Sequence, residues 1–132
     1  MNAVTKMVET VTITVETTVD PEWVDLCTKY NDLFIHGYCG YWMRGYARTD
    51  KLGWLVRESD DDDPEKAPAE VLKAWRAGEP LPQGWHRLDI DMARKAWVEG
   101  FKRDGQSWFE NGDANTYDNA VQLAMLGEVR YG

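Results

Sequence analysis

The feature that most constrains the fold is a change of hydrophobic period near residue 20. Residues 8–19 alternate apolar and polar side chains, which predicts a half-buried β-strand. Asp20 and Pro21 follow, a pair typical of a helix N-cap and first turn. Apolar residues then recur at spacings of three and four up to Gly37, as in an amphipathic helix. A chain that passes so abruptly from a strand period to a helix period belongs to a mixed α and β class.

The rest of the chain continues in short elements separated by glycine, proline and aspartate. The pattern predicts strands near 41–48, 54–58 and 85–88, the first two forming a hairpin. Helices are expected at 69–77, at 90–103 after a capping Asp89, and at 115–126, and residues 128–132 are expected as a final strand. The 132 residues make one domain of ordinary size. We therefore predict a single α+β domain over 1–132, with a small, mostly antiparallel sheet and three to four packed helices.

Composition and charge exclude several function classes. The formal net charge of −8 argues against a general nucleic-acid binder. No apolar run approaches the roughly 18 residues of a membrane span. The N-terminus has no apolar signal core, so export is not expected and the interpretation is a cytoplasmic protein.

The metal-ligating residue types do not form a metal motif. Cys27 and Cys39 are the only cysteines, in keeping with a reducing compartment. Together with His36 and His86 they match no zinc knuckle or ribbon spacing. We expect no metal and no cofactor.

The negative charge is concentrated in one loop, at about residues 58–66. Six of the 23 acidic residues lie between Glu58 and Glu65, and the remaining 17 nearly balance the 15 basic ones. The run Asp60–Asp63 is interpreted as a solvated loop. Two alternatives stay open: loose binding of a hard cation, or a surface through which a protein–protein inhibitor or DNA mimic docks.

No catalytic motif is present, so we do not expect an enzyme. The sequence has no Gly-rich phosphate loop before a helix, no nucleophile elbow and no His-Glu-x-x-His. Two other segments are chemically rich and form the candidate ligand site.

The first segment combines glycines and aromatic residues between Gly37 and Tyr46. Aromatic faces stack on planar ligands, and an arginine clamps anions in a bidentate manner. The candidate residues are Tyr38, Tyr41, Trp42 and Arg44. The plainer interpretation is that Tyr38 and Trp42 belong to the core and that the glycines form a tight turn.

The second segment enters the last expected helix. Asp113, Asn115, Asp118 and Gln122 are suited to hydrogen-bond sugar hydroxyls or an amide-bearing ring. The plainer interpretation is helix capping by Asp113, Asn115 or Thr116. Sequence alone does not bring the two segments together.

Two features favour a homo-oligomer. The chain has seven tryptophans, and the helix expected at 115–126 is apolar almost all round. Most of the tryptophans belong in the core, and the surplus predicts a subunit interface.

The order of these segments resembles small proteins of bacteriophages and prophages. The specific motifs are the run Gly37–Trp42 and the C-terminal run 120–132, which ends Leu-Gly-Glu-Val-Arg-Tyr-Gly. The resemblance covers most of the chain except residues 60–85, and it implies a protein made in the cytoplasm of an infected or lysogenic bacterium. It transfers no site residues.

The function expected from these observations is non-catalytic binding. The sequence favours a counter-defence protein that sequesters a small, nucleotide-derived signal of the host. Five arginines are available for phosphate contacts: Arg44, Arg48, Arg57, Arg87 and Arg130. The alternatives are a protein–protein inhibitor or DNA mimic that captures a host protein through Asp60–Asp63, and a small enzyme or virion-associated protein.

Overall fold

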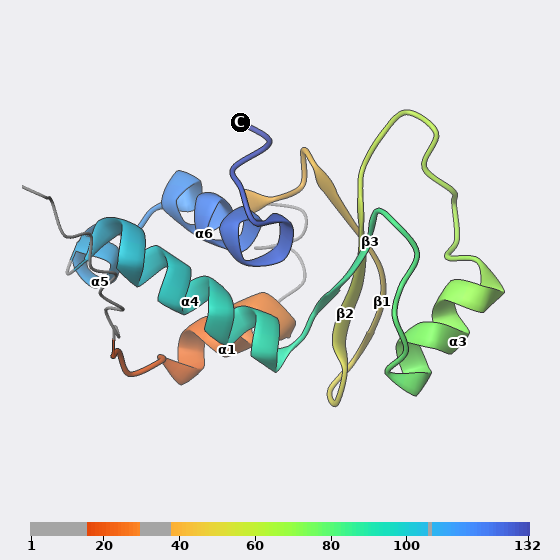
Figure 1. Cartoon of the computed structure of the whole chain (residues 1–132), viewed down its shortest axis with the longest axis horizontal. Helices are drawn as coiled ribbons and strands as arrows, with labels where there is room; N and C mark the ends of the chain where they lie inside the picture. Colours follow the sequence, from red (N-terminus) through yellow and green to blue (C-terminus); the bar gives the residue numbers. More distant parts are fainter. Residues whose placement is uncertain (1–15, 30–37, 106) are drawn as a thin grey trace, which may run out of the picture.

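A three-stranded antiparallel sheet divides the molecule into two helical layers (Figure 1). The computed structural model describes residues 16–29, 38–105 and 107–132. The strands are β1 (Met43–Thr49), β2 (Gly53–Glu58) and β3 (Trp85–Leu88), in the order β1-β2-β3. On one side lie α1 (Pro21–Thr28), α4 (Ile90–Asp104), α5 (Ser107–Asn111) and α6 (Ala114–Leu126), and on the other lies α3 (Ala69–Ala77). This arrangement confirms the predicted α+β class.

The β1–β2 hairpin turns at Gly53, where only glycine fits. Its φ is +67°, and a Cβ atom there would stand 2.3 Å from the carbonyl oxygen of Leu88. Further along β1 the register shifts between Gly45 and Ala47, which leaves Tyr46 as a bulge. Because of the bulge, Tyr46 and Ala47 both pack on the α3 side of the sheet.

The central strand β2 is buried on both faces, so the sheet carries two separate cores. Trp54 and Val56 face α1, α4 and α6, whereas Leu55 faces α3. All seven tryptophans are buried within this single chain. The surplus of tryptophan therefore gives no support to the expected subunit interface.

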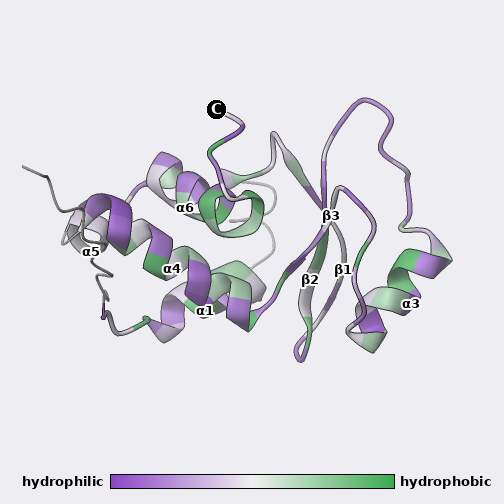
Figure 2. Cartoon of the chain, in the orientation of Figure 1, coloured by the Kyte–Doolittle hydropathy of each residue, from purple (hydrophilic) through white to green (hydrophobic). Residues whose placement is uncertain are grey.

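Three aspartates begin the helices as the sequence predicts. Asp20 accepts a hydrogen bond from the Glu22 backbone N–H at 2.9 Å, and Asp89 does so from Met92 at 2.9 Å. Asp113 caps α6 in the same way. Along α4, hydrophilic and hydrophobic residues follow one another in short bands, as expected of a helix buried on one side (Figure 2).

Several expectations need correction or fall outside the described residues. Residues 16–20, expected in part as a strand, are irregular because Thr17 accepts a hydrogen bond from the Trp97 indole at 3.2 Å and Val19 packs on the core. Residues 128–132 are not a strand either: the backbone of Arg130 and Tyr131 bonds to the Gln122 side chain instead of a neighbouring strand. The short helix α5 was not predicted. Residues 8–15 and 30–37, which belong to the predicted strand and first helix, lie outside the described part of the chain.

Candidate functional site

The structure brings the two predicted segments together through four of their residues. Tyr41 and Trp42 precede β1 and face Asp118 and Gln122 on α6. The Trp42 indole N–H donates to Asp118 Oδ1 at 2.7 Å, and the Tyr41 hydroxyl donates to Asp118 Oδ2. Gln122 Nε2 donates to Asp118 Oδ1 at 3.2 Å, one helical turn along α6. These four side chains form one polar network rather than an open pocket: Trp42, Asp118 and Gln122 are buried, and Tyr41 covers them from the surface at 57% exposure.

The environment of Asp118 raises the pKa values of two nearby groups, the Tyr41 phenol and the Cys39 thiol. Burial, together with the hydrogen bond to Asp118 and its charge, raises the pKa of Tyr41 to about 12. Burial and the nearby Asp118 carboxylate also raise the pKa of the Cys39 thiol. A buried thiol that stays protonated is a poor nucleophile and a poor metal ligand.

The C-terminal tail, residues 127–132, closes this network. Gln122 Oε1 accepts hydrogen bonds from the backbone N–H groups of Arg130 and Tyr131, each at 2.8 Å. Gln122 Nε2 donates to the Tyr131 carbonyl at 3.0 Å. The Tyr131 ring stacks on Trp42 with centroids 5.5 Å apart and planes 8° from parallel.

Glu58, at the end of β2, is a member of the site that sequence reasoning missed. It accepts hydrogen bonds from Arg130 and the Tyr131 hydroxyl, both at 2.8 Å, and lies 3.1 Å from His86 Nε2. Burial alone would raise the pKa of Glu58, but the hydrogen bonds from His86 and Tyr131 and the charges of His86 and Arg130 lower it. No local signal could have found Glu58, because its partners Arg130 and Tyr131 lie 72 and 73 positions further along the chain.

Three of the predicted residues do not join the network. The Tyr38 ring meets the edge of Tyr117, with centroids 5.6 Å apart. Asp113 bonds the backbone and hydroxyl of Thr116, and these bonds lower its pKa. Asn115 is exposed on the first turn of α6. Asp113 thus serves as a helix cap, as the plainer interpretation holds.

The eighth predicted residue, Arg44, lies on the other face of the sheet. Its guanidinium carbon stands 5.1 Å from the centre of the Tyr46 ring, a cation–π arrangement. Both residues line an open hollow of about 330 Å³ between β1, residues 65–67 and the first turn of α3. The Arg44 hollow, as we call it, is lined by Arg44, Gly45, Tyr46, Glu65, Lys66, Ala67 and Leu72.

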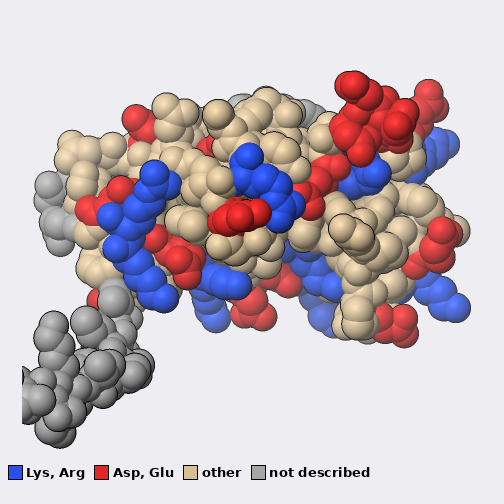
Figure 3. All heavy atoms as spheres, turned by 45° about the horizontal axis from the view of Figure 1, so that its top comes forward, with Lys and Arg blue, Asp and Glu red and all other residues tan. Residues whose placement is uncertain are grey.

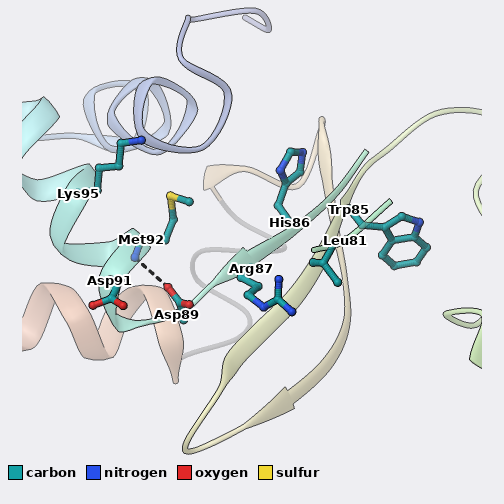
Figure 4. Close-up of a pocket in the computed structure, with 8 residues that line it drawn as sticks. All are labelled: Leu81, Trp85, His86, Arg87, Asp89, Asp91, Met92 and Lys95. Atoms are coloured by element: carbon teal, nitrogen blue, oxygen red, sulfur yellow. Dashed lines mark hydrogen bonds between the residues drawn. The ribbon is translucent and has the colours of Figure 1, made fainter. Parts of the chain in front are cut away.

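A second concavity, of about 410 Å³, lies along the outer edge of β3 (Figure 4). His86 and Trp85 point to opposite sides of the strand, and Met92 and Lys95 approach from α4. Arg87, which also lines this groove, already has hydrogen-bond partners: it donates to the Ala74 and Glu79 carbonyls at 3.0 and 2.6 Å. Asp89 of the groove caps α4. The polar groups of this groove therefore serve mainly to join β3 to the helices.

The acidic loop is held by hydrogen bonds to Asp63, which a fully solvated run of aspartates would lack. Asp63 accepts hydrogen bonds from Arg57, from the Ser59 hydroxyl at 2.6 Å and from the Asp60 backbone. Burial opposes ionisation of Asp63, but these partners outweigh it and lower the pKa. Asp61 and Asp62 are exposed, and acidic side chains gather over this projecting loop (Figure 3).

Residues 16–29, 38–105 and 107–132 carry neither a metal-binding cluster nor a membrane-spanning helix. This part of the chain contains no group of three or more His, Cys, Asp or Glu residues that could hold a metal ion. Within the same ranges, no helix has the length and apolar character needed to cross a membrane. Cys27 and Cys39 are buried and free.

Comparisons of the chain with protein-family models, with curated proteins and with solved structures found no match.

Proposed function

We propose that the protein is a non-catalytic binding protein that captures a small, planar, anionic molecule of the nucleotide class in the Arg44 hollow. The single observation that carries the proposal is the state of Arg44. Of the five arginines suited to phosphate contacts, four are engaged by oxygen atoms of the protein: Arg48 by Asp50, Arg57 by Asp60 and Asp63, Arg87 by the end of α3, and Arg130 by Glu58 and Glu128. Among the described residues, Arg44 has no ion-pair partner.

The surroundings of Arg44 suit such a ligand. A second cation, Lys66, lies in the same hollow, also without an ion pair to any residue that the structure describes. The Tyr46 hydroxyl donates to the Pro64 carbonyl at 2.7 Å, which fixes an aromatic ring beside both cations. The volume of about 330 Å³ falls at the lower end of the range for small-molecule sites. Glu65 supplies an acceptor for a ring N–H or a sugar hydroxyl.

The biological setting of the proposal is counter-defence in a phage-infected or lysogenic bacterium, where the ligand is a nucleotide-derived signal of the host. This setting rests on the resemblance of the Gly37–Trp42 and C-terminal motifs to phage and prophage proteins. Sequestration needs tight binding without turnover, and the hollow offers recognition groups of both kinds, cationic and aromatic.

The test is a binding titration with a defined panel. The purified chain is titrated with adenosine and guanosine monophosphates, diphosphates and cyclic dinucleotides, followed by calorimetry and native mass spectrometry. For the ligand that binds, Arg44→Ala is expected to weaken affinity by about tenfold or more, because charge-assisted hydrogen bonds contribute about 1.5–3 kcal/mol. Arg94→Ala, which removes an exposed arginine from α4, is the control of equal charge. Retention of no panel member, or equal losses in both variants, contradicts the proposal.

A second candidate function uses the acidic loop. Asp61 and Asp62 are exposed, and acidic side chains gather at one end of the molecule (Figure 3). This favours a protein–protein inhibitor or DNA mimic that docks a basic host protein through the acidic loop. In that case Asp61→Asn with Asp62→Asn weakens capture of the partner and reduces its salt dependence, whereas Arg44→Ala does not.

A further inference from the structure

The last residues of the chain are held in the way that a peptide ligand is held. Gln122 presents its amide to the tail and both accepts from and donates to the backbone of Arg130 and Tyr131. A neighbouring strand would offer an extended peptide the same alternation of acceptor and donor. The side chain of Gln122 is fully buried, at 0% exposure, although it makes these bonds to residues at the chain end.

The side chains of the tail are also recognised specifically. One oxygen of Glu58 accepts from both the Arg130 guanidinium and the Tyr131 hydroxyl. The flat face of Trp42 covers the Tyr131 ring. The slot formed by Trp42, Glu58 and Gln122 thus selects a cationic residue followed by a hydroxylated aromatic one.

Each wall of this tail slot also has a partner outside the tail. Trp42 and Gln122 are both fixed by Asp118, and Glu58 is fixed by its place at the end of β2 and by His86. Its three walls therefore come from the turn before β1, from the sheet and from α6. A slot whose walls are held by other partners keeps its shape when the tail leaves.

The connection between α6 and the tail is short and weakly held. α6 ends at Leu126, and Gly127 adopts the left-handed conformation with φ +81°. Glu128 and Val129 are exposed, Val129 at 44%. Because the α6 cap is complete at Gly127, the tail can move away without unwinding the helix.

We propose that the tail slot is a peptide-binding site for an Arg-Tyr segment and that it exchanges its own tail for the tail of a second copy of this chain. A second copy of this chain carries the same Arg130 and Tyr131, whereas any other partner would need an equivalent Arg-Tyr pair. Exchange of an identical element between copies costs little, since every contact is kept. Tethering gives the chain's own tail an effective concentration in the millimolar range, so exchange grows with protein concentration.

The first experiment measures the slot alone, in the full-length chain. Tyr131→Ala removes the stacking ring from the tail, and a fluorescent peptide of residues 127–132, Gly-Glu-Val-Arg-Tyr-Gly, is then titrated against it. We expect the peptide to bind this variant at least about tenfold more tightly than the wild type, in which the tethered tail competes. The same peptide with alanine in place of its tyrosine is the control and is expected not to bind.

The second experiment tests exchange between copies by complementation. The Tyr131→Ala chain has an intact slot, and a Gln122→Ala chain has an intact tail. An equimolar mixture is expected to form a heterodimer in native mass spectrometry at high concentration, which neither variant forms alone. Glu58→Gln replaces Gln122→Ala if circular dichroism shows that the latter is unfolded.

Two results would overturn the proposal. If the peptide does not bind the Tyr131→Ala chain, the slot is no recognition site. If the peptide binds but the mixture and the wild type stay monomeric at millimolar concentration, the tail is only an intramolecular strap and no exchange occurs.

Discussion

The two faces of the sheet differ in how they surround a carboxylate. On the α6 face, the Asp118 carboxylate is buried and satisfied by Tyr41, Trp42 and Gln122, and the C-terminal tail closes over them. On the α3 face, the corresponding carboxylate, Asp63, binds Arg57 in a surface loop, and a hollow stays open beside it.

The difference follows from how much structure covers each face. Helices α1, α4 and α6 contribute to the first core, whereas the single helix α3, of nine residues, covers the second. A short helix leaves the first residues of β1 uncovered, and the bulge at Tyr46 fills only part of that space. The closed face therefore supports stability, and the open face offers room for a ligand.

The largest expected effect distinguishes the two carboxylates. Asp118→Ala is expected to lower the free energy of unfolding by about 3 kcal/mol, because it leaves the buried Trp42 indole N–H without an acceptor and removes one of the acceptors of the Gln122 amide. Asp63→Ala is expected to cost about 1–2 kcal/mol, since its partners can turn to water. Denaturant unfolding measures both. Equal losses of unfolding free energy in the two variants would contradict the expected difference between the buried and the surface carboxylate.

The next effect compares two equally buried tryptophans, each 1% exposed. Trp42 donates its indole N–H to Asp118, whereas the Trp75 indole N–H has no partner among the described residues. Trp42→Phe is expected to cost about 2 kcal/mol through the lost charged hydrogen bond, and Trp75→Phe less than about 1 kcal/mol. A larger loss for Trp75→Phe would contradict this ranking.

A smaller effect appears at alkaline pH. Because the pKa of Tyr41 is raised from 10 to about 12, the folded state keeps the phenol proton where the unfolded state has lost it. This contribution to stability is complete below pH 10 and is lost as the pH rises toward about 12. Tyr41→Phe is expected to reduce this alkaline loss, as followed by thermal unfolding from pH 9 to pH 12. An unchanged slope in the variant would show that Tyr41 does not contribute.

The smallest effect is expected at the tip of the acidic loop. Asp61→Asn together with Asp62→Asn is expected to change the free energy of unfolding by no more than about 0.5 kcal/mol, because both side chains are exposed. Asp63→Asn in the same loop is the matched control and is expected to destabilise measurably. A clear loss from the double substitution would show that the tip has partners of its own.

Prediction from the sequence succeeded where local chemistry decides. The caps at Asp20, Asp89 and Asp113, the stops at Gly78 and Gly127 and the strands β1 to β3 all follow from short-range patterns. It failed at residues 128–132, where the backbone bonds to a side chain of α6 instead of a strand. No local pattern predicts that Gln122 takes the place of a neighbouring strand.

The candidate site was likewise predictable from the sequence only in part. The residue types of Tyr41, Trp42, Asp118 and Gln122 suggested a shared site, but nothing in the sequence showed that residues 76 and more positions apart would meet. The same reasoning placed Arg44 beside Trp42, but Trp42 lies in the turn before β1 and packs in the same core as Met43. Alternation begins only at Met43, so the next residue, Arg44, lies on the other face. The residue at which a strand begins, and hence which face each side chain takes, was not fixed by the local pattern.

By itself, the sequence determined the three strands and the helices α3, α4 and α6, because capping residues, glycine stops and the period of apolar residues act within a few positions. Tertiary structure alone decided which polar groups became buried partners, which of the five candidate arginines has no ion-pair partner among the described residues, and where Arg130 and Tyr131 lie. The physical reason is that hydrogen bonds and burial depend on distances between segments far apart in the chain, and only the packing of the two cores against β2 sets those distances.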